Sequence, residues 1–295
     1  MPYARVRSID IKYEIIGDAG PWAVLSTGGR NPYGEFVPIA HKIAAGGFRV
    51  LLHDRRNCGG SEVALDDSQG EDPHRVDDLH ALVSHLGIGP AFFGGSSSGC
   101  RMSLLYYLKH PERVRGLMLI RVTGGPYPAS RLPENYYGQF IRAAERGGMA
   151  AVCAMDHWNA VIVARPANLD ILMSMPPQRF IAIMTRWREL FCEGIDGPAV
   201  GITAEQFAAI RAPTIVVPGN DKIHSLASGR LAHSLIPNAK LHQLPVEDTG
   251  AELIWFAEWA EHYDELAGAL VSFMRDASPG TRSPTVLRPG VPSHP

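Results

Sequence analysis

The sequence predicts an α/β protein in which a mostly parallel central sheet carries flanking helices. Short β-branched or aromatic runs alternate with helical patterns along most of the 295-residue chain. Several runs, such as VLLHD and GLMLI, are almost continuously apolar, which is typical of strands covered on both faces. One interval, between Pro126 and Ile210, has helical periodicity and no strand-like run, so it predicts an all-helical insertion.

The elements follow from these patterns in chain order. The expected strands are 6–16 (a hairpin arm), 22–27, 48–54, 91–95, 116–122, 214–218 and 240–244. The expected helices outside the insertion are 36–45, 76–86, 99–109, 228–235 and one within 258–274.

These elements group into one interrupted domain. Residues 1–125 and 211–276 form the expected α/β core, and residues 126–210 form a helical cap over the carboxyl edge of the sheet. Gly-Gly-Pro and Ala-Pro sequences mark the ends of the cap and predict hinges there. The tail, 277–295, is rich in Pro, Ser and Gly and cannot bury enough apolar surface to order itself, so we expect it to be disordered.

Composition excludes several classes of function. A net charge of −2 leaves no basic surface for nucleic acid or an anionic membrane, and no apolar run is long enough to span a bilayer. The N-terminus has no signal-peptide pattern, which predicts a cytoplasmic protein acting on a small molecule. The 4 cysteines are far apart, so we expect no zinc site and no disulfide framework. Neither a metal nor a cofactor is expected, and formation of a homo-oligomer stays open.

The most informative motif is G-x-S-x-G, formed by Gly95, Ser97 and Gly99. An apolar strand precedes it and a helical pattern follows, which is the context of a serine placed on a sharp strand-to-helix turn. Such a turn strains the backbone of the serine, and only small residues on either side let the strand and helix approach closely. The alternative is an ordinary glycine-rich turn.

With this motif in that context, the chain resembles the α/β-hydrolase superfamily over nearly its whole length, to about residue 274. The run HPERVRGLMLI is similar to the helix and sixth strand that follow the family's nucleophile. The stretch from Asp54 to Ser61 resembles its D-x-R-G-x-G-x-S turn, with Asn57 in place of the usual glycine. The helical insertion lies where this family carries a cap.

The resemblance implies a nucleophile and an oxyanion hole. Ser97 is the expected nucleophile, and the backbone N–H groups of Gly29 and Ser98 are the expected oxyanion donors by position. Two such donors each stabilise a developing alkoxide by a few kcal/mol. A simple tight turn is the alternative for the glycine pair that includes Gly29.

The acid of a catalytic triad also has a candidate by resemblance. Asp221 ends the sequence Gly-Asn-Asp after the strand at 214–218, where the family keeps its carboxylate. Asp221 also suits an N-cap of the following helix.

The base departs from the family's pattern. The family's histidine follows the last strand, but here Val246–Gly250 contains Glu247 and Asp248 and no histidine. Three histidines are candidates for the role: His224, His262 and His242, of which His242 lies inside a predicted strand and is expected to pack or point away. His157 in the cap is a further candidate. We favour His224, because its loop follows the carboxyl end of a strand near Ser97. A histidine base predicts an acidic limb in kcat/KM at roughly pH 6 to 7.

The sequence thus favours a cofactor-independent serine hydrolase of a small, mostly apolar ester, lactone or related acyl compound. The aromatic and Met residues of the cap predict an apolar cavity over Ser97. The missing histidine keeps two alternatives open. One is a lyase, cyclase or C–C bond-cleaving enzyme acting through Asp248 or Glu247, and the other is a ligand-binding protein without catalysis.

Overall fold

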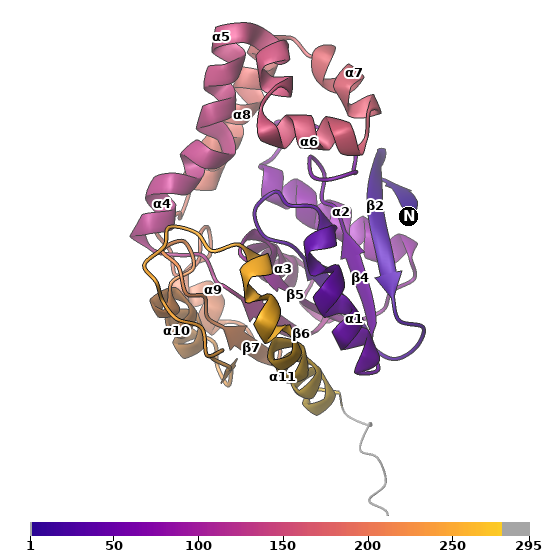
Figure 1. Ribbon diagram of the computed structural model, residues 1–295, viewed down its shortest axis with the longest axis vertical. Coiled ribbons are helices and arrows are strands. Elements are labelled where there is room, and N and C mark those ends of the chain that lie inside the picture. The colour runs from indigo at the N-terminus through magenta and orange to yellow at the C-terminus, as the bar shows by residue number, and fades with distance from the viewer. Residues whose placement is uncertain (1, 279–295) are drawn as a thin grey trace, which may run out of the picture.

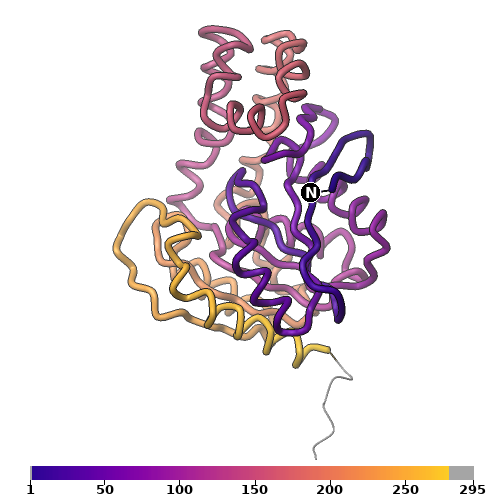
Figure 2. The backbone as a smooth tube through the Cα atoms, turned by 45° about the vertical axis from the view of Figure 1, so that its right-hand side comes forward, coloured from indigo at the N-terminus to yellow at the C-terminus, as the bar shows by residue number. Residues whose placement is uncertain are grey.

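The computed structural model of the chain describes residues 2–278, which form a sheet domain with a smaller helical lobe above it (Figure 1). The disordered tail expected at 277–295 therefore lies, except for its first two residues, outside the described residues. Viewed from a second side, the helical lobe is again set apart from the sheet domain (Figure 2).

The sheet has eight strands in the order β1-β2-β4-β3-β5-β6-β7-β8. Only β1 with β2 and β2 with β4 pair antiparallel, and the other neighbours are parallel. The predicted fold class is confirmed. The strands are β1 (Tyr3–Val6), β2 (Ile9–Ile16), β3 (Trp22–Ser26), β4 (Arg49–His53), β5 (Ala91–Ser96), β6 (Val114–Ile120), β7 (Thr214–Val217) and β8 (Lys240–Leu241).

Helices cover both faces of the sheet, which explains the continuous apolar runs of its strands. One face packs against α1 (Val37–Ala45) and α11 (Tyr263–Asp276), which also contact each other. The other face packs against α2 (Glu71–His85), α3 (Ser98–Lys109), α9 (Ala204–Ala208) and α10 (Leu226–Leu235). Two apolar clusters therefore hold the parallel strands with their carboxyl ends along one edge.

The helical lobe consists of the segments that follow β6. They are α4 (Pro126–Pro133), the π-helical turn η3 (Glu134–Gly138), α5 (Gln139–Cys153), α6 (Asp156–Ala164), α7 (Ala167–Met173) and α8 (Pro177–Cys192). Their amphipathic faces enclose a third apolar cluster that includes Trp158, Phe180 and Trp187. An isolated antiparallel bridge between Ala199 and Ile202 interrupts the helical pattern before α9.

Polar contacts join the helical lobe to the sheet domain. Trp187 Nε1 donates to the carbonyl oxygens of Asp66 and Gln69 at 2.9 and 3.0 Å. The side-chain oxygen of Asn168 accepts the backbone N–H of Val63 at 3.0 Å, and its amide donates to the carbonyl of Ser61 at 3.0 Å. The lobe is thus fixed to the segment that follows β4.

Several elements differ from their expected bounds. The strand expected at 6–16 is a hairpin of two strands, β1 and β2. Helix α2 begins at Glu71 rather than at residue 76, because its first turn buries charged side chains and so shows no apolar periodicity. Strand β8 ends at Leu241 rather than at residue 244. Both residues of β8 are exposed and pair with β7 on one side, and Pro245 has no N–H with which to extend the ladder.

Candidate active site

Ser97 lies on a strained turn between β5 and α3, called the elbow below, where its φ and ψ are 56° and −117°. The flanking glycines are required by close backbone packing. A Cβ atom on Gly95 would lie 2.1 Å from the carbonyl oxygen of Ser26, and one on Gly99 would lie 2.0 Å from it. The turn therefore has the steric features that the motif predicts, and the strain is concentrated at one residue.

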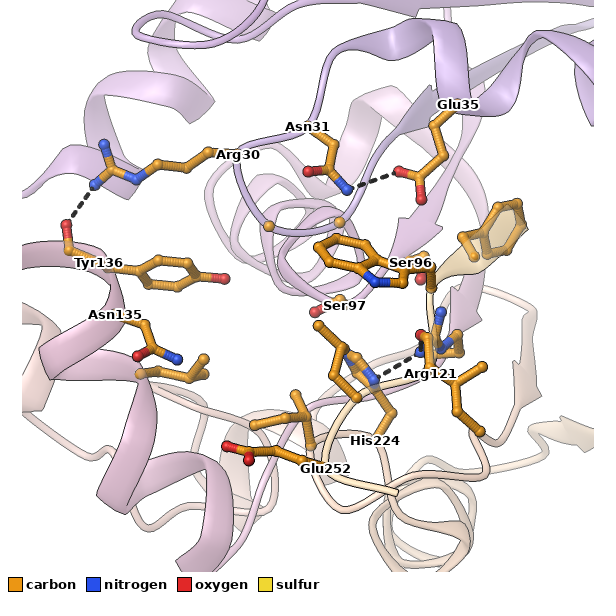
Figure 3. Close-up of a pocket in the computed structure, with 18 residues that line it drawn as sticks. Arg30, Asn31, Glu35, Ser96, Ser97, Arg121, Asn135, Tyr136, His224 and Glu252 are labelled. Atoms are coloured by element: carbon orange, nitrogen blue, oxygen red, sulfur yellow. Dashed lines mark hydrogen bonds between the residues drawn. The ribbon is translucent and has the colours of Figure 1, made fainter. Parts of the chain in front are cut away.

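The side chain of Ser97 faces a cavity of about 340 Å³ (Figure 3). The cavity is bounded by the loop after β3, the elbow, the η3 turn of the helical lobe and the segment before α11. Its lining residues are Gly28, Gly29, Arg30, Asn31, Glu35, Ser96, Ser97, Arg121, Leu132, Asn135, Tyr136, Ile223, His224, Glu252, Leu253, Ile254, Trp255 and Phe256. Its volume suits a small organic molecule.

The apolar wall of this cavity comes mainly from outside the cap helices, whose aromatic residues mostly form the core of the lobe. Of the cap aromatics, Tyr136 lines the cavity, whereas Trp158 and Trp187 are buried in the apolar cluster of the lobe. The continuous segment from Glu252 to Phe256 supplies the remaining aromatic surface. This contribution was not predictable from the residue pattern, because the segment has neither helical nor strand periodicity.

Asp221 and His224 form a buried pair in the loop after β7. Asp221 Oδ1 accepts the backbone N–H of His224 at 2.7 Å, and His224 Nδ1 lies 3.0 Å from both carboxylate oxygens. Asp221 is not the cap of the following helix, since Ser225 caps α10 through the N–H of Ser228. Because Nδ1 faces two acceptors, we assign its proton to the hydrogen bond with Asp221.

The other ring nitrogen of His224 is an unused acceptor. The side chain of His224 is buried and lines the same cavity as Ser97, and its Nε2 has no hydrogen-bond partner among the described residues. Ser97 Oγ lies 3.1 Å from Thr123 Oγ1, and the described hydrogen bonds do not join it to His224. The structure brings Ser97 and His224 to one cavity without a direct hydrogen bond between them, and it places Asp221 behind His224.

Arg121 contacts both members of the Asp221–His224 pair. Its Nη2 donates to Asp221 Oδ2 at 2.6 Å and lies 3.1 Å from His224 Nδ1, and it also donates to the carbonyl of Ile254. Like Ser97, Arg121 has a left-handed backbone, with φ of 57°. Both strained residues follow neighbouring strands at the carboxyl edge of the sheet.

This environment shifts the pKa of both partners downward. Burial would raise the pKa of Asp221, but the hydrogen bond and charge of His224, the N–H of Ile254 and Arg121 outweigh it and hold the pKa below its usual value. Burial is the main cause that lowers the pKa of His224 to about 4, and Arg121 adds to it against the opposing effect of Asp221. His224 is therefore neutral at pH 7, and the expected acidic limb moves from roughly pH 6 to 7 down to about 4.

The other candidates for the base do not line this cavity. Nε2 of His262 lies 3.6 Å from Glu261, and Nε2 of His242 lies 3.2 Å from Glu265. Neither histidine lines the cavity that holds Ser97. His157 packs against Trp158 and Phe140 inside the helical lobe. Glu247 and Asp248 are exposed on the surface and are absent from the cavity wall.

The expected oxyanion donors border Ser97. Gly29 lines the cavity with φ of +50°, and a Cβ on its neighbour Gly28 would lie 3.2 Å from Ser97 Cβ. Ser98 is the first residue of α3, so its N–H belongs to the unpaired donors at a helix N-terminus. The loop after β3 therefore lies directly against the elbow.

Four side chains at or next to the candidate site were not predicted from the sequence: Arg55, Arg121, Thr123 and Glu35. Arg121 and Thr123 follow β6, which lies between β5 and β7 in the sheet, so the strand order alone would have placed them between Ser97 and Asp221. Glu35 lines the cavity, accepts from Asn31 Nδ2 at 3.1 Å, and has its pKa raised mainly by burial.

Among the described residues we find neither a metal-binding cluster nor a membrane-spanning helix. Within 2–278, no group of three or more His, Cys, Asp or Glu side chains is arranged to hold a metal ion. No helix in that range is long and apolar enough to cross a membrane. The cysteines Cys58, Cys100, Cys153 and Cys192 are all free thiols.

Comparison with known proteins agrees with this architecture. The α/β-hydrolase-fold family matches residues 25–146, which include β3, β4, β5 and the elbow. The enol-lactonase from Burkholderia xenovorans LB400 superposes with a TM-score of 0.63 at 21% identity, over 93% of this chain and all of that one. The chain has the α/β-hydrolase fold, as the sequence predicts.

Sequence relatives in this superfamily are hydrolases. A proline iminopeptidase of Neisseria gonorrhoeae is 38% identical over 42% of this chain and 50% of its own length. A 2-hydroxymuconate semialdehyde hydrolase of Pseudomonas putida is 27% identical over 66% of this chain and 68% of its own length. The chain thus spans about half the length of the proline iminopeptidase that it matches.

Proposed function

We propose that the protein is a cofactor-independent serine hydrolase of a small, mostly apolar ester, lactone or related acyl compound. The observation that carries the proposal is the buried Asp221–His224 pair, whose free Nε2 belongs to the wall of the cavity that holds Ser97. A neutral imidazole oriented by a carboxylate is the base that a serine nucleophile needs.

In this proposal the base has moved from the loop after β8 to the loop after β7. Acid and base are three residues apart, and the N–H of His224 bonds to Asp221, so one short loop fixes both. Arg121 and the N–H of Ile254 hold the carboxylate from the other side. The departure at residues 246–250 is then a relocation of the base rather than its loss.

The catalytic steps follow from this arrangement. Ser97 Oγ attacks the acyl carbon as His224 Nε2 takes the hydroxyl proton, and the N–H groups of Gly29 and Ser98 stabilise the oxyanion. His224 then protonates the leaving alcohol, and water hydrolyses the acyl-enzyme by the reverse roles. In the free enzyme Ser97 bonds to Thr123, so substrate must bring the hydroxyl to His224, as catalytic hydrogen bonds often tighten only in the complex.

The substrate class rests on the cavity and on the named relatives. Leu132, Ile223, Leu253 and Phe256 supply apolar surface near Ser97. Proteins similar to this chain include an enol-lactonase, by structure, and a 2-hydroxymuconate semialdehyde hydrolase, by sequence. A small acyl compound fits a cavity of about 340 Å³.

A fluorophosphonate probe tests the proposal. We expect the wild type to be labelled rapidly, with the label mapped to Ser97 by peptide mass spectrometry, and to hydrolyse short 4-nitrophenyl esters. Ser97→Ala should abolish both, while Ser96→Ala, its neighbour on β5, serves as the matched control. Label on Ser96, or turnover that survives Ser97→Ala, would contradict the assignment.

A further inference from the structure

The side chain of Arg55 lies directly behind the elbow and the loop after β3. Arg55 follows Asp54 at the end of β4 and is 3% exposed. Its Nη1 donates to Ser98 Oγ at 2.9 Å, and its Nη2 donates to the carbonyl of Gly29 at 2.7 Å. These are the two residues whose N–H groups form the proposed oxyanion hole.

A third hydrogen bond closes the contact between the two loops. Ser98 Oγ donates to the carbonyl of Gly29 at 2.8 Å, so Arg55, Ser98 and Gly29 are joined pairwise. Arg55 Nη2 also lies 3.4 Å from the carbonyl of Gly28. Because C=O and N–H point in opposite directions across a trans peptide, a Gly28 carbonyl turned toward Arg55 directs the N–H of Gly29 away from it, toward the cavity.

Arg55 differs from the other buried arginines around it in having no ion pair. Arg30 and Arg75 pair with Glu71, and Arg101 pairs with Asp72. The ion pairs of the described residues do not include Arg55, whose hydrogen-bond partners are a hydroxyl and carbonyl oxygens. Burial lowers its pKa, yet a guanidinium stays protonated in proteins.

An unpaired buried cation is an unfavourable way to tie two loops together. Desolvation of a charge without a counter-charge is destabilising, and a neutral amide would make similar hydrogen bonds without it. The charge is compensated when negative charge develops nearby. The oxyanion of the proposed reaction develops on the opposite side of the Gly29 and Ser98 peptides.

We infer that Arg55 is a positioning residue for the oxyanion hole, which it builds by holding Gly29 and Ser98 and strengthens by its positive charge, which no carboxylate of the described residues contacts directly. The inference rests on the proposed hydrolase function. Arg55 acts through the two N–H donors and does not touch the substrate. It therefore stabilises the transition state, where the oxygen is charged, more than the bound neutral substrate.

The test compares Arg55→Met, Arg55→Lys and a matched control, Arg56→Met. Arg56 is 4% exposed and donates two hydrogen bonds to the carboxylate of Asp78. When Arg56 is removed, Asp78 keeps Arg7 as a partner at 2.8 Å. Each variant reacts with a fluorophosphonate, and kcat and KM are measured with a neutral ester. In the labelling step Ser97 Oγ bonds to phosphorus, fluoride leaves, His224 takes the hydroxyl proton, and the phosphoryl oxygen occupies the oxyanion hole.

We expect Arg55→Met to label about a hundredfold more slowly than wild type, the scale of losing one oxyanion donor. Its kcat should fall by a similar factor while KM stays within about threefold, because the lost interaction is made in the transition state. Arg55→Lys, which keeps the charge, should recover part of the loss, and Arg56→Met should stay within about threefold of wild type. If circular dichroism shows that Arg55→Met does not fold, the test rests on Arg55→Lys, whose kcat should then lie below that of wild type.

Three results would overturn the inference. One is labelling by Arg55→Met at the wild-type rate, and a second is a change confined to KM. The third is an equal loss in Arg55→Met and Arg56→Met, which would indicate a general structural effect. A wild type that neither labels nor hydrolyses esters would overturn the proposed function together with the inference, so the two failures are distinguishable.

Discussion

Replacing Arg121 by methionine should move the acidic limb of kcat/KM to higher pH. Arg121 Nη2 lies 3.1 Å from His224 Nδ1 and opposes protonation of the ring, whose pKa burial and this charge lower to about 4. The neutral ring is the base, so the rate falls as pH drops through that pKa. Removing the guanidinium also leaves the charge of Asp221 uncompensated, and this raises the pKa of His224 further.

The size of the shift follows from the separation of the charges. Two unit charges about 4 Å apart interact by about 4 kcal/mol at an effective dielectric constant of about 20. Relaxation of the site and entry of water reduce this, and one pKa unit corresponds to about 1.4 kcal/mol. We therefore expect the limb to move by about one to two units, from about 4 to between about 5 and 6.

The assay is kcat/KM for a neutral ester between about pH 3.5 and 8, which reports the pKa of the free enzyme. Arg113→Met is the matched control, because Arg113 donates to the carbonyl of Ile88 on the far side of the sheet domain from the cavity. Circular dichroism at each pH separates titration from unfolding. A limb that stays within half a unit of wild type in Arg121→Met would refute the electrostatic reasoning, as would a wild-type limb near pH 6.5.

Three further predictions concern the elbow and the helical lobe. Ser97→Gly should abolish turnover yet raise the free energy of unfolding by about 1 kcal/mol, because glycine adopts the strained angles freely; a lower melting temperature would contradict this. Gly95→Ala should fail to yield soluble protein, since its Cβ would lie 2.1 Å from the carbonyl of Ser26, and a Gly95→Ala melting within a few degrees of wild type would count against the packing. Residues 127–210 should exchange amide hydrogens faster than β5, as expected of a mobile lid with Gly and Pro at its ends, and equal protection would indicate a fixed part of the core.

The sheet was predictable because its strands are covered on both faces and leave uninterrupted apolar runs in the sequence. Predictions failed where polar groups are buried. The first turn of α2 hides Glu71 and Asp72 in ion pairs with arginines, so its charged sequence reads as a loop. The predicted end of β8 was wrong for a different reason. An exposed edge strand needs few apolar residues, so no apolar pattern marks where it ends.

The candidate site was predictable where a motif fixes the backbone. The elbow requires glycines at set positions, and Asp221 follows a strand end that the resemblance identifies. Arg55 stands at a variable position of the D-x-R-G-x-G-x-S turn, and Arg121 and Thr123 belong to no motif. Their proposed roles come from strand order and from contacts between distant loops. The absent histidine after β8 drew attention to His224, but only the structure shows its Nδ1 on Asp221 and its Nε2 unpaired.

The central claim is that His224, from the loop after β7, is the base for Ser97. The most direct measurement is kcat/KM for a neutral ester in His224→Ala, beside Asp248→Asn, with the double variant that adds Ser97→Ala. We expect His224→Ala to lose at least about a hundredfold, and the double variant to cost little more than either change alone. Asp248→Asn should match wild type. A nearly silent His224→Ala together with a damaging Asp248→Asn would contradict the account and favour the non-hydrolytic alternative.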